Sequence, residues 1–502
     1  MAAELETDPT ESGSKRSSSA VLVVVCVALA SVVSAMASLN VALPSIAEAT
    51  HASQTQLSWV IDAYSLAFAA LLLPAGAIGD KYGRKLTLIA GLAIFGIISA
   101  VAMTSGTANE LIVLRALLGV GAALVMPATL STITATFPAD QRTKAVGVWT
   151  GVAGGSAVLG LLSSGLLLQV WDWRSVFGLN VVLAALAIAG TLRFVPESRD
   201  RDTPPLDLIG AALVVIGLTM LVFSVIEAPT EGWLAARTLG GIAVAAVVLA
   251  VFVVWELRQA HPMLDPRVFA HRGLSAGSIT ILVQFFAFFG FVFVLLQYLQ
   301  LVRGDSALVA ALSLLPMAAT MMPTTRATAI LVPHFGAARV SIAGLLLAAG
   351  SLAWLAQVDH HSSYWVLLAG LAPLGVGMGA AMTPATSAIT EALPRSQQGV
   401  ASALNDLARE VGGALGIAVI GSILNAVYRS HLSLPGAPAA VVTKARDSFG
   451  VAAHIGGQVT VSAQSAFVSG MHAAVIGTAV AATVAAVAVA LLTWPARHES
   501  TD

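Results

Sequence analysis

The chain has 502 residues, of which 57% are hydrophobic and only 10% are charged, with a net charge of −1 and a mean hydropathy of +0.87. Because a soluble domain carries about 25% charged residues, this chain has too little charge to cover a water-facing surface. We therefore expect an all-α integral membrane protein, and no basic field suggests a nucleic-acid partner. The single cysteine excludes a disulfide framework and a cysteine metal cluster, so we expect neither a metal nor a cofactor.

Fourteen apolar runs are long enough to cross a bilayer, since a helix needs about 20 apolar residues to span about 30 Å of hydrocarbon. In chain order these runs lie at 20–44, 57–79, 87–104, 109–136, 146–170, 175–194, 208–226, 239–256, 275–302, 308–332, 340–358, 364–390, 399–425 and 467–494. Residues 1–18 are polar and are predicted to be a disordered tail, and 496–502 form a second tail. Between the last two runs, 427–465 are predicted to form one long outer loop.

The basic residues are distributed unevenly over the loops between these runs. With the N-terminus inside, seventeen of the 25 Lys and Arg residues fall on the cytoplasmic side and six on the outer side. Since cytoplasmic loops carry an excess of Lys and Arg, both termini are predicted to be cytoplasmic. We expect a multi-pass protein of a bacterial cytoplasmic (inner) membrane.

Faint repeats divide the chain into two halves. "LVMPATLSTITATFP" (124–138) is echoed by "AMTPATSAITEALP" (381–394), and "YGRKLTLIAG" (82–91) by "FGAARVSIAG" (335–344). Parallel six-helix repeats are typical of transporters whose halves move around a midplane site. We expect a bundle over 19–194, a linker with two inserted helices over 195–272, and a second bundle over 273–495.

The segment "GAIGDKYGRK" (76–85) concentrates charge between two apolar runs. Gly76 and Gly83 permit close backbone approach, and the carboxylate of Asp80 suits a helix N-terminus. With this motif the chain resembles the major facilitator superfamily, in its fourteen-helix branch of drug:proton antiporters. The resemblance implies that Gly76, Asp80, Gly83, Arg84 and Lys85 form a cytoplasmic latch between the halves; a simple positive-inside anchor is the alternative.

Further segments carry the same resemblance, and some positions depart from it. The matching segments are "NVALPSI" (40–46), "WVIDAYSLAFAALLLPAG" (59–76), "LRALLGVGAA" (114–123), "WDWRSVFGLN" (171–180), "YLQLV" (298–302) and "SALNDLAREVGGALG" (402–416). Ala35 stands where the family has a helix 1 acid, and Leu161 replaces the proline of the helix 5 antiporter signature. The resemblance implies a monomeric transporter that exports hydrophobic or cationic small molecules in exchange for protons by alternating access. A uniporter or symporter for a specific metabolite is the alternative, whereas no motif supports an enzyme.

Five charged residues fall inside the predicted spans, where a charge costs at least about 2.5 kcal/mol and needs a partner, water or a function. Asp406, Arg409 and Glu410 lie three and four residues apart, on one side of a helix. Two carboxylates cannot both be neutralised by one guanidinium, so this group is the predicted proton-coupling site, with Glu410 the first choice as carrier. Asp62 and Arg115 lie at similar depth and are predicted to pair. A purely structural ion pair is the alternative for both groups.

The sequence gives weaker evidence for the residues of a substrate cavity. "VQFFAFFGFVF" (283–293) predicts an aromatic pocket, with Gln284 and Gln297 as its polar contacts, although packing explains many of these phenylalanines. Asn405 and Trp149 are further candidates by position. The expected partners are a small-molecule substrate, protons and the lipid bilayer.

Overall fold

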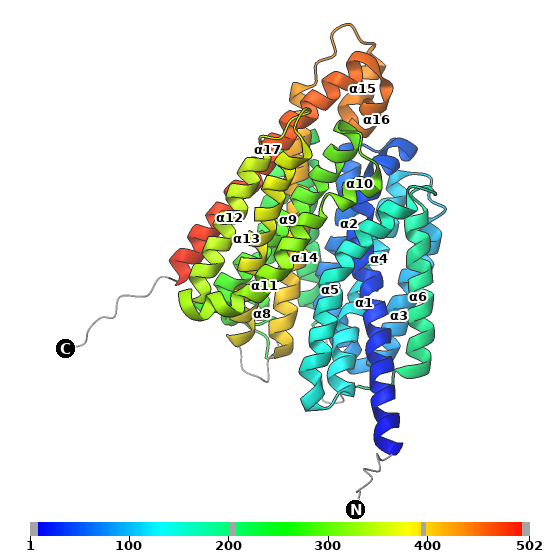
Figure 1. The fold of residues 1–502 in the computed structure, drawn as a ribbon, viewed down its shortest axis with the longest axis vertical. Coiled ribbons are helices and arrows are strands. Elements are labelled where there is room, and N and C mark those ends of the chain that lie inside the picture. The colour runs from blue at the N-terminus through cyan, green and yellow to red at the C-terminus, as the bar shows by residue number, and fades with distance from the viewer. Residues whose placement is uncertain (1–8, 200–206, 261, 263, 393–397, 494–502) are drawn as a thin grey trace, which may run out of the picture.

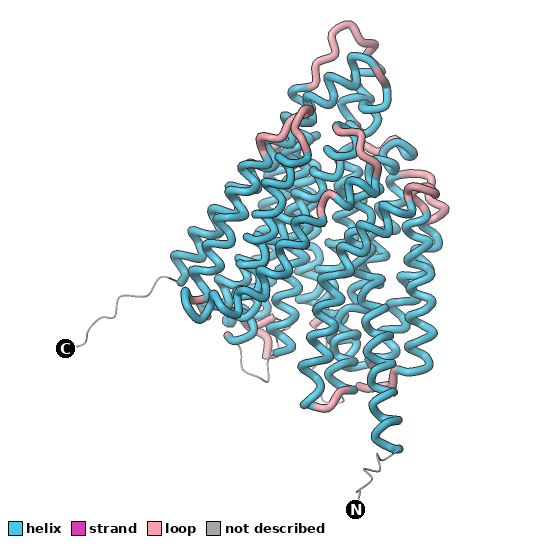
Figure 2. The backbone as a smooth tube through the Cα atoms, viewed as in Figure 1, coloured by secondary structure: helices cyan, strands magenta, loops and turns pink. Residues whose placement is uncertain are grey.

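The computed structural model describes residues 9–199, 207–260, 262, 264–392 and 398–493. Within these ranges the chain forms helices joined by short connections and contains no β-strand, as Figure 2 shows. The predicted all-α fold is confirmed for the described part of the chain.

The helices follow the predicted order of two bundles and an inserted pair. The N-terminal half contains α1 (Pro9–Thr50), α2 (Gln54–Tyr82), α3 (Arg84–Ala102), α4 (Ala108–Thr136), α5 (Ala139–Leu167) and α6 (Ser175–Phe194). The inserted pair is α7 (Leu208–Glu231) and α8 (Ala236–Glu256). The C-terminal half contains η1 (Pro266–Ala270), α9 (Arg272–Gln297), the π-helical turn η2 (Tyr298–Val302), α10 (Ala307–Leu312), α11 (Leu315–Phe335), α12 (Ala337–Leu355), α13 (Tyr364–Glu391), α14 (Gln398–His431), α15 (Ala439–Asp447), α16 (Phe449–Ile455) and α17 (Gly457–Thr493).

The two halves stand side by side, and Figure 1 shows them meeting at one end and separating toward the other. We call the end that carries α15 and α16 the cap end, and the end where α1 begins and α17 ends the terminal end. Contacts between the halves run mainly through α2 with α14 and α5 with α10. Because both described ends of the chain lie at the terminal end, the number of crossings is even.

Thirteen helices of the described chain are long and apolar enough to cross a membrane. The fourteenth predicted span corresponds to α5, which is 29 residues long but contributes a shorter apolar stretch, Gly155–Leu167. The predicted fourteen-helix arrangement therefore agrees with the structure. The prediction differs from the structure near the start of the chain, where residues 9–18 of the expected tail belong to α1. Residues 1–8 and the second expected tail, 496–502, lie outside the described residues. The expected outer loop contains α15 and α16.

Polar capping fixes where two of the spans begin at the cap end. The Ser53 hydroxyl accepts a hydrogen bond from the Gln56 amide, and the Gln56 side chain accepts one from the Ser53 amide. Thr107 and Glu110 form the same reciprocal pair at the start of α4. Such capping boxes satisfy amides that a helix leaves unpaired, so both spans begin at a defined residue.

The α7–α8 pair lies on the seam where α2 of one half meets α14 of the other. The Trp59 indole N–H donates to Glu227 Oε1 over 3.2 Å, which joins α2 to α7. The Ser422 hydroxyl donates to the Val225 main-chain oxygen over 2.6 Å, which joins α14 to α7. The three helices also share a buried apolar cluster with α8. The inserted pair is therefore bonded to both halves.

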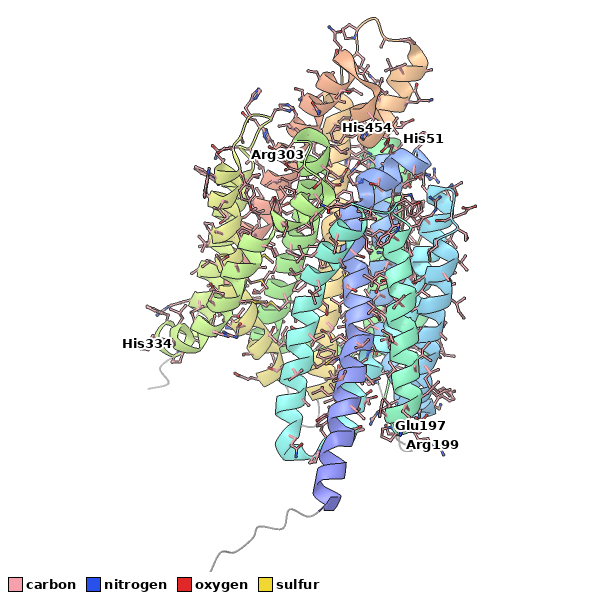
Figure 3. The ribbon with its side chains drawn as sticks, turned by 45° about the vertical axis from the view of Figure 1, so that its right-hand side comes forward. His51, Glu197, Arg199, Arg303, His334 and His454 are labelled. Atoms are coloured by element: carbon pink, nitrogen blue, oxygen red, sulfur yellow. The ribbon has the colours of Figure 1, made fainter. Side chains whose placement is uncertain are left out.

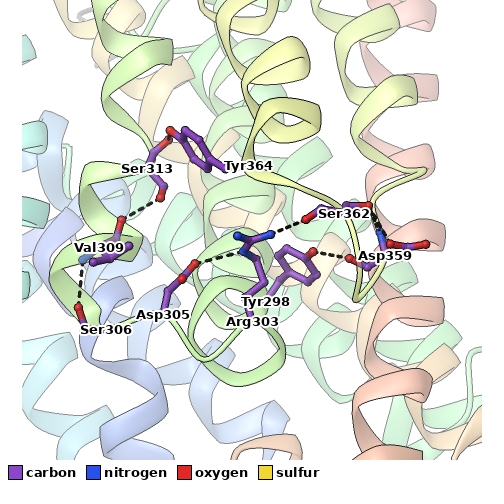
Figure 4. A network of polar contacts seen from close by, with 9 residues as sticks. All are labelled: Tyr298, Arg303, Asp305, Ser306, Val309, Ser313, Asp359, Ser362 and Tyr364. Carbon is purple, nitrogen blue, oxygen red and sulfur yellow. Dashed lines mark hydrogen bonds and ion pairs between the residues drawn. The ribbon is translucent and has the colours of Figure 1, made fainter.

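A polar network closes the C-terminal half at the cap end, around the π-helical turn η2 (Figure 4). The Tyr298 hydroxyl donates to the Asp359 main-chain oxygen, and Arg303 donates to the Ser362 main-chain oxygen, each over 2.6 Å. Arg303 also pairs with Asp305 at 3.2 Å. In the same loop the hydrogen bond from Ser362 lowers the pKa of the Asp359 carboxyl. These bonds hold the 303–305 turn against the loop before α13.

Two hydrogen bonds cross between the halves near the cap end. The Gln300 amide nitrogen donates to the Val41 main-chain oxygen over 3.0 Å. The Asn425 amide nitrogen donates to the Thr55 hydroxyl over 3.3 Å. Together with the spreading seen in Figure 1, they describe a molecule closed at the cap end and spread at the terminal end.

Candidate functional site

The segment predicted to be a latch forms the tight connection between α2 and α3 at the terminal end. Gly83 has φ +122°, and a Cβ there would lie 2.7 Å from Glu197 Oε1. Glu197 accepts a hydrogen bond from the Lys85 amide over 3.2 Å, and the Arg84 amide donates to the Ser198 main-chain oxygen over 2.9 Å. Figure 3 places Glu197 at the end where α1 begins.

These main-chain contacts of Arg84 and Lys85 stay within the N-terminal half, because residues 197 and 198 follow α6 directly. A carboxylate does lie against the start of a helix, as the sequence suggests for this segment. It comes from Glu197, while the side chain of Asp80 lies outside the described part. A latch between the halves stays a prediction.

A cavity of about 140 Å³ lies between the two halves. Its walls come from α1, α2, α4 and α5 on one side and from α9, α10, α11, α13 and α14 on the other. Most of the lining is apolar and includes the phenylalanines Phe68, Phe285, Phe288 and Phe289 and the methionines Met36, Met126, Met317, Met321, Met378 and Met382. Cavities of this kind, apolar with a few convergent polar groups, are the usual binding sites for small molecules.

Four polar side chains line the cavity: Asn40, Gln284, Arg409 and Glu410. The amide nitrogens of Asn40 and Gln284 are used by main-chain oxygens, with Gln284 donating to Met378 over 2.7 Å. Their oxygens, and Oε2 of Glu410, are buried without a hydrogen-bond partner among the described residues. Since burying such an atom unpaired costs about 1–3 kcal/mol, these oxygens are ready to accept a ligand's donors.

Of the three charged residues predicted to form a cluster on α14, only Asp406 and Arg409 pair with each other in the described structure. Arg409 pairs with Asp406 at 3.7 Å, and its guanidinium lies 4.7 Å from the centre of the Phe285 ring. Glu410 is not in an ion pair with Arg409 in the described structure, and its side chain lines the cavity. Asp406 does not line the cavity. The arrangement gives one paired carboxylate and one carboxylate that lines the cavity and forms no ion pair among the described residues.

Glycines bring α14 close to α9. A Cβ at Gly412 would collide with the Leu282 main-chain oxygen, and one at Gly416 with that of Phe286. Because small residues let membrane helices approach closely, these positions set the distance between the two helices. The aromatic face of α9 and the charged face of α14 therefore meet in one wall of the cavity.

The predicted ion pair between Asp62 and Arg115 is wrong. Arg115 instead donates from Nε to the Val60 main-chain oxygen over 2.8 Å and lies 4.3 Å from the centre of the Tyr64 ring. Val60 and Tyr64 are each two residues from Asp62, and at 100° per residue this spacing places Asp62 on the opposite side of α2. Both Asp62 oxygens are buried without a hydrogen-bond partner in the described structure.

Asp62 lies on the side of α2 that faces α14 and α7. Ser58, one turn before it, would be 2.8 Å from a Cβ at Gly421 of α14. Leu66, one turn after it, belongs to the apolar cluster shared with α7 and α14. The buried acid of the N-terminal half is therefore at the seam, outside the cavity.

Three of the four predicted cavity residues do not line it. Gln297 lies beyond the cavity, at the end of α9 near the cap end. Its side chain donates to the Phe293 main-chain oxygen one turn earlier. The Asn405 side chain bonds to Thr386, and the Trp149 indole donates to the Thr129 hydroxyl. Only Gln284 faces the cavity.

Asn40 and most of the methionines that line the cavity were not predicted from the sequence. Met317 and Met321 are four residues apart, and so are Met378 and Met382. A spacing of four places both members of a pair on one helix face. Two such pairs in neighbouring helices were the signal for a methionine-lined wall. Asn40, an isolated amide one turn after Met36, was the signal on α1.

The described helices and the cavity between two bundles can be compared with known proteins. Residues 23–417 match the Major Facilitator Superfamily. The chain belongs to this superfamily. Its membership makes the chain a multi-pass membrane transporter, and the resemblance drawn from the 76–85 motif is confirmed.

Relatives within the superfamily are named for resistance and efflux. The chain is 35% identical to the methyl viologen resistance protein SmvA of Salmonella typhimurium, over 83% of this chain and 85% of that protein. It is 34% identical to the multidrug efflux pump LfrA of Mycolicibacterium smegmatis, over 86% of this chain and 87% of that protein. A similar match links it to the tetracenomycin C resistance and export protein of Streptomyces glaucescens, at 33% identity over 76% and 72%.

Solved structures of the superfamily fold superpose on almost the whole chain. A bacterial homologue of the human lysosomal transporter Spinster gives a TM-score of 0.67 at 18% identity, covering 95% of this chain and 97% of that one. The POT family transporter PepTSo gives a TM-score of 0.65 at 16% identity, covering 94% of this chain and 97% of that one. At this identity the similarity shows a shared fold.

Proposed function

We propose that the chain is a drug:proton antiporter that exports hydrophobic and cationic compounds across a bacterial cytoplasmic membrane by alternating access. The observation that carries the proposal is the position of Glu410, a carboxylate that lines an apolar cavity between the two halves without an ion-pair partner. The resistance and efflux proteins that share about a third of their residues with this chain support the same activity.

Glu410 is the proposed proton carrier because a proton and a cationic compound compete for its carboxylate. The other charged groups near it on α14 are Arg409 and Asp406, which pair with each other. The remaining described lining residues, on the eight other helices of the cavity wall, carry no charge. A ligand can shift only states that it binds unequally, so this competition couples proton uptake to substrate release.

The other predicted residues receive supporting roles in this proposal. Asp406 is the second proton site and acts through Arg409, whereas Asp62 at the α2–α14 seam is the third, with Arg115 holding α2 in place. Gly76, Asp80, Gly83, Arg84 and Lys85 form the latch that closes the terminal end in the outward-facing state. The terminal end is cytoplasmic.

The test is transport in proteoliposomes with an imposed pH gradient. The wild-type protein should accumulate ethidium against its concentration gradient, and Glu410→Gln should not, because glutamine mimics the protonated carboxyl permanently. The same variant should still exchange ethidium down its gradient. Glu391→Gln, at an exposed position near the end of α13, is the matched control. Gradient-driven accumulation by a Glu410→Gln, Asp406→Asn double variant would show that α14 does not couple protons to transport.

A further inference from the structure

The side of α2 that meets α14 and α7 carries a stripe of polar residues. Its members follow one another at intervals of three or four residues, which places them on one side of the helix: Thr55, Ser58, Asp62 and Ser65. Burial increases along this stripe, since Thr55 is partly exposed, Ser58 is buried, and Asp62 and Ser65 have no exposed surface. The stripe therefore leads from the cap end into the molecule and stops at a buried carboxyl group.

The α14 side of the seam is polar only toward the cap end. There the Asn425 amide nitrogen donates to the Thr55 hydroxyl, and its side-chain oxygen is buried without a partner in the described structure. On the other side of Asp62, Leu66 and Ala418 belong to the apolar cluster shared with α7. Apolar side chains offer no group that can carry a proton, so polar contacts reach Asp62 from the cap end. This path does not pass through the cavity, which Asp62 does not line.

The inserted helix α7 places a second carboxylate beside this stripe. Glu227 lies one turn before the end of α7 and accepts the indole N–H of Trp59 over 3.2 Å. Trp59 is three residues before Asp62, so the two side chains are neighbours on the surface of α2, about 4.5 Å apart along the helix axis. Glu227 is partly exposed, whereas Asp62 is fully buried. Glu227 therefore stands between the cap-end surface and the buried acid.

Neither Glu227 nor Asp62 forms an ion pair among the described residues. The charged groups on the helices packed against them are engaged elsewhere or lie on other sides: Arg115 on α4, the Glu231–Arg237 pair at the α7–α8 connection, and Glu410 and Arg429 on α14, the latter paired with Asp447. A buried carboxylate without a cation is costly as an anion. Asp62 is therefore a proton acceptor, and Glu227 lies where it can supply the proton.

We propose that Glu227 of the inserted helix α7 is the outer proton acceptor of the transporter and that protons reach Asp62 along the seam, by a route separate from the substrate cavity. The inference rests on the export against protons proposed above and deepens it. Glu227 takes a proton from water at the cap end and gives it to the Ser58 hydroxyl, whose own proton passes to the Asp62 carboxylate. Because a hydroxyl both donates and accepts, Ser58 ends unchanged and Glu227 is ionised again.

The first test is ethidium accumulation in proteoliposomes at different pH values on the cap-end side, with the pH difference across the membrane held constant. At alkaline pH, Glu227→Gln should be about tenfold slower than the wild type, because it lacks the group that collects scarce protons. At acidic pH the two rates should converge, since water then protonates Asp62 directly. Glutamine keeps an oxygen for the Trp59 indole, so a purely structural role predicts no such dependence on pH. Glu231→Gln, one turn later on α7 and exposed, is the matched control and should follow the wild type.

The second test needs no transport. Infrared difference spectroscopy of the purified full-length protein after a rapid drop in pH follows the carbonyl band of protonated Asp62, which is assigned by its absence in Asp62→Asn. The band should rise about tenfold more slowly in Glu227→Gln than in the wild type. An equally fast rise, or a band that does not respond to pH, would overturn the inference, as would equal ethidium rates at alkaline pH. Failure of the wild type to accumulate ethidium would instead contradict the proposed exporter itself.

Discussion

Asp62 and Arg115 differ in what holds them, although both are buried charges of the N-terminal half. Arg115 is held by the main-chain oxygens of Val60 and Ala35 and by the Tyr64 ring, so it links α1, α2 and α4. Asp62 has no hydrogen-bond partner among the described residues. A buried charge without a partner costs stability, whereas a donor bonded to main-chain oxygens contributes to it.

We therefore expect opposite effects from neutralising these two residues. Asp62→Asn should leave the melting temperature of the purified protein unchanged or raise it by a few degrees, because an unpaired buried carboxyl is replaced by an amide of the same shape and no bonded partner is lost. Arg115→Met should lower it by several degrees, since hydrogen bonds to charged groups contribute about 1.5–3 kcal/mol each. The measurement is a thermal unfolding scan in detergent. A similar loss in both variants would contradict the conclusion that the Asp62 carboxyl contributes no stabilising contact.

At the residue scale, the sequence predicts which charges are buried better than it predicts their partners. Glu410 and Gln284 were found because a charge or an amide is rare in an apolar run. Asp62 and Arg115 lie at similar depth along their helices, which is why the sequence predicts a pair. They do not pair because Asp62 lies on the side of α2 opposite to the one that Arg115 contacts. Direction could be judged only once the contacts of Val60 and Tyr64 were known.

At the element scale, contacts between residues distant in sequence help to fix where a helix begins and ends. The 76–85 motif predicts a tight turn, and the φ of +122° at Gly83 confirms it. The sequence offered no reason to connect this turn with residues 112 positions later. Glu197 accepts hydrogen bonds from the amides of Lys85 and Ser198 and so ties the start of α3 to the chain after α6.

Removal of the Glu197 carboxylate should loosen the start of α3 without unfolding the protein. In Glu197→Ala the Lys85 amide loses its acceptor, so its hydrogen exchange should become about tenfold faster, while amides in the middle of α3 remain protected. Glu391→Ala, at an exposed position near the end of α13, serves as the control and should leave exchange at α3 unchanged. Unchanged exchange at Lys85 in Glu197→Ala would mean that the turn is held by the glycine geometry alone.

For the whole molecule, the number and order of the spans followed from hydropathy, because each backbone polar group in a bilayer must be paired within a helix.

The predicted orientation of the molecule in the membrane rests on the distribution of Lys and Arg. Cysteines at Ala260, between α8 and η1, and at Ala440 in α15 test it, since both positions are exposed and lie at opposite ends. In whole cells, with Cys26 replaced by serine, a membrane-impermeant maleimide should label the cysteine at 440 and leave the one at 260 unlabelled. The reverse labelling pattern would show that the orientation in the membrane is opposite to the predicted one.

The arrangement of the halves was beyond the sequence, because a transporter alternates between at least two arrangements and one sequence encodes both. In the structure, α2 and α14 meet toward the cap end, where a Cβ at Gly421 would lie 2.8 Å from the Ser58 hydroxyl. Side-chain atoms this close are within reach of a disulfide, whose Cβ atoms are about 3.5–4.5 Å apart. If export requires the cap end to open, these two positions must separate once in every cycle.

A cross-link between them should therefore stop transport in a reversible way. Ser58→Cys with Gly421→Cys, in the Cys26→Ser background, should form a disulfide under mild oxidation, abolish ethidium transport in proteoliposomes and regain it on reduction. Ser58→Cys with Gly421→Ser carries a side chain of similar size at 421 without a second thiol, so oxidation should leave its transport unchanged. Mass spectrometry establishes that the disulfide has formed. Full transport by the cross-linked protein would mean that the α2–α14 seam stays closed throughout the cycle, and the path out of the cavity would then have to open elsewhere at the cap end.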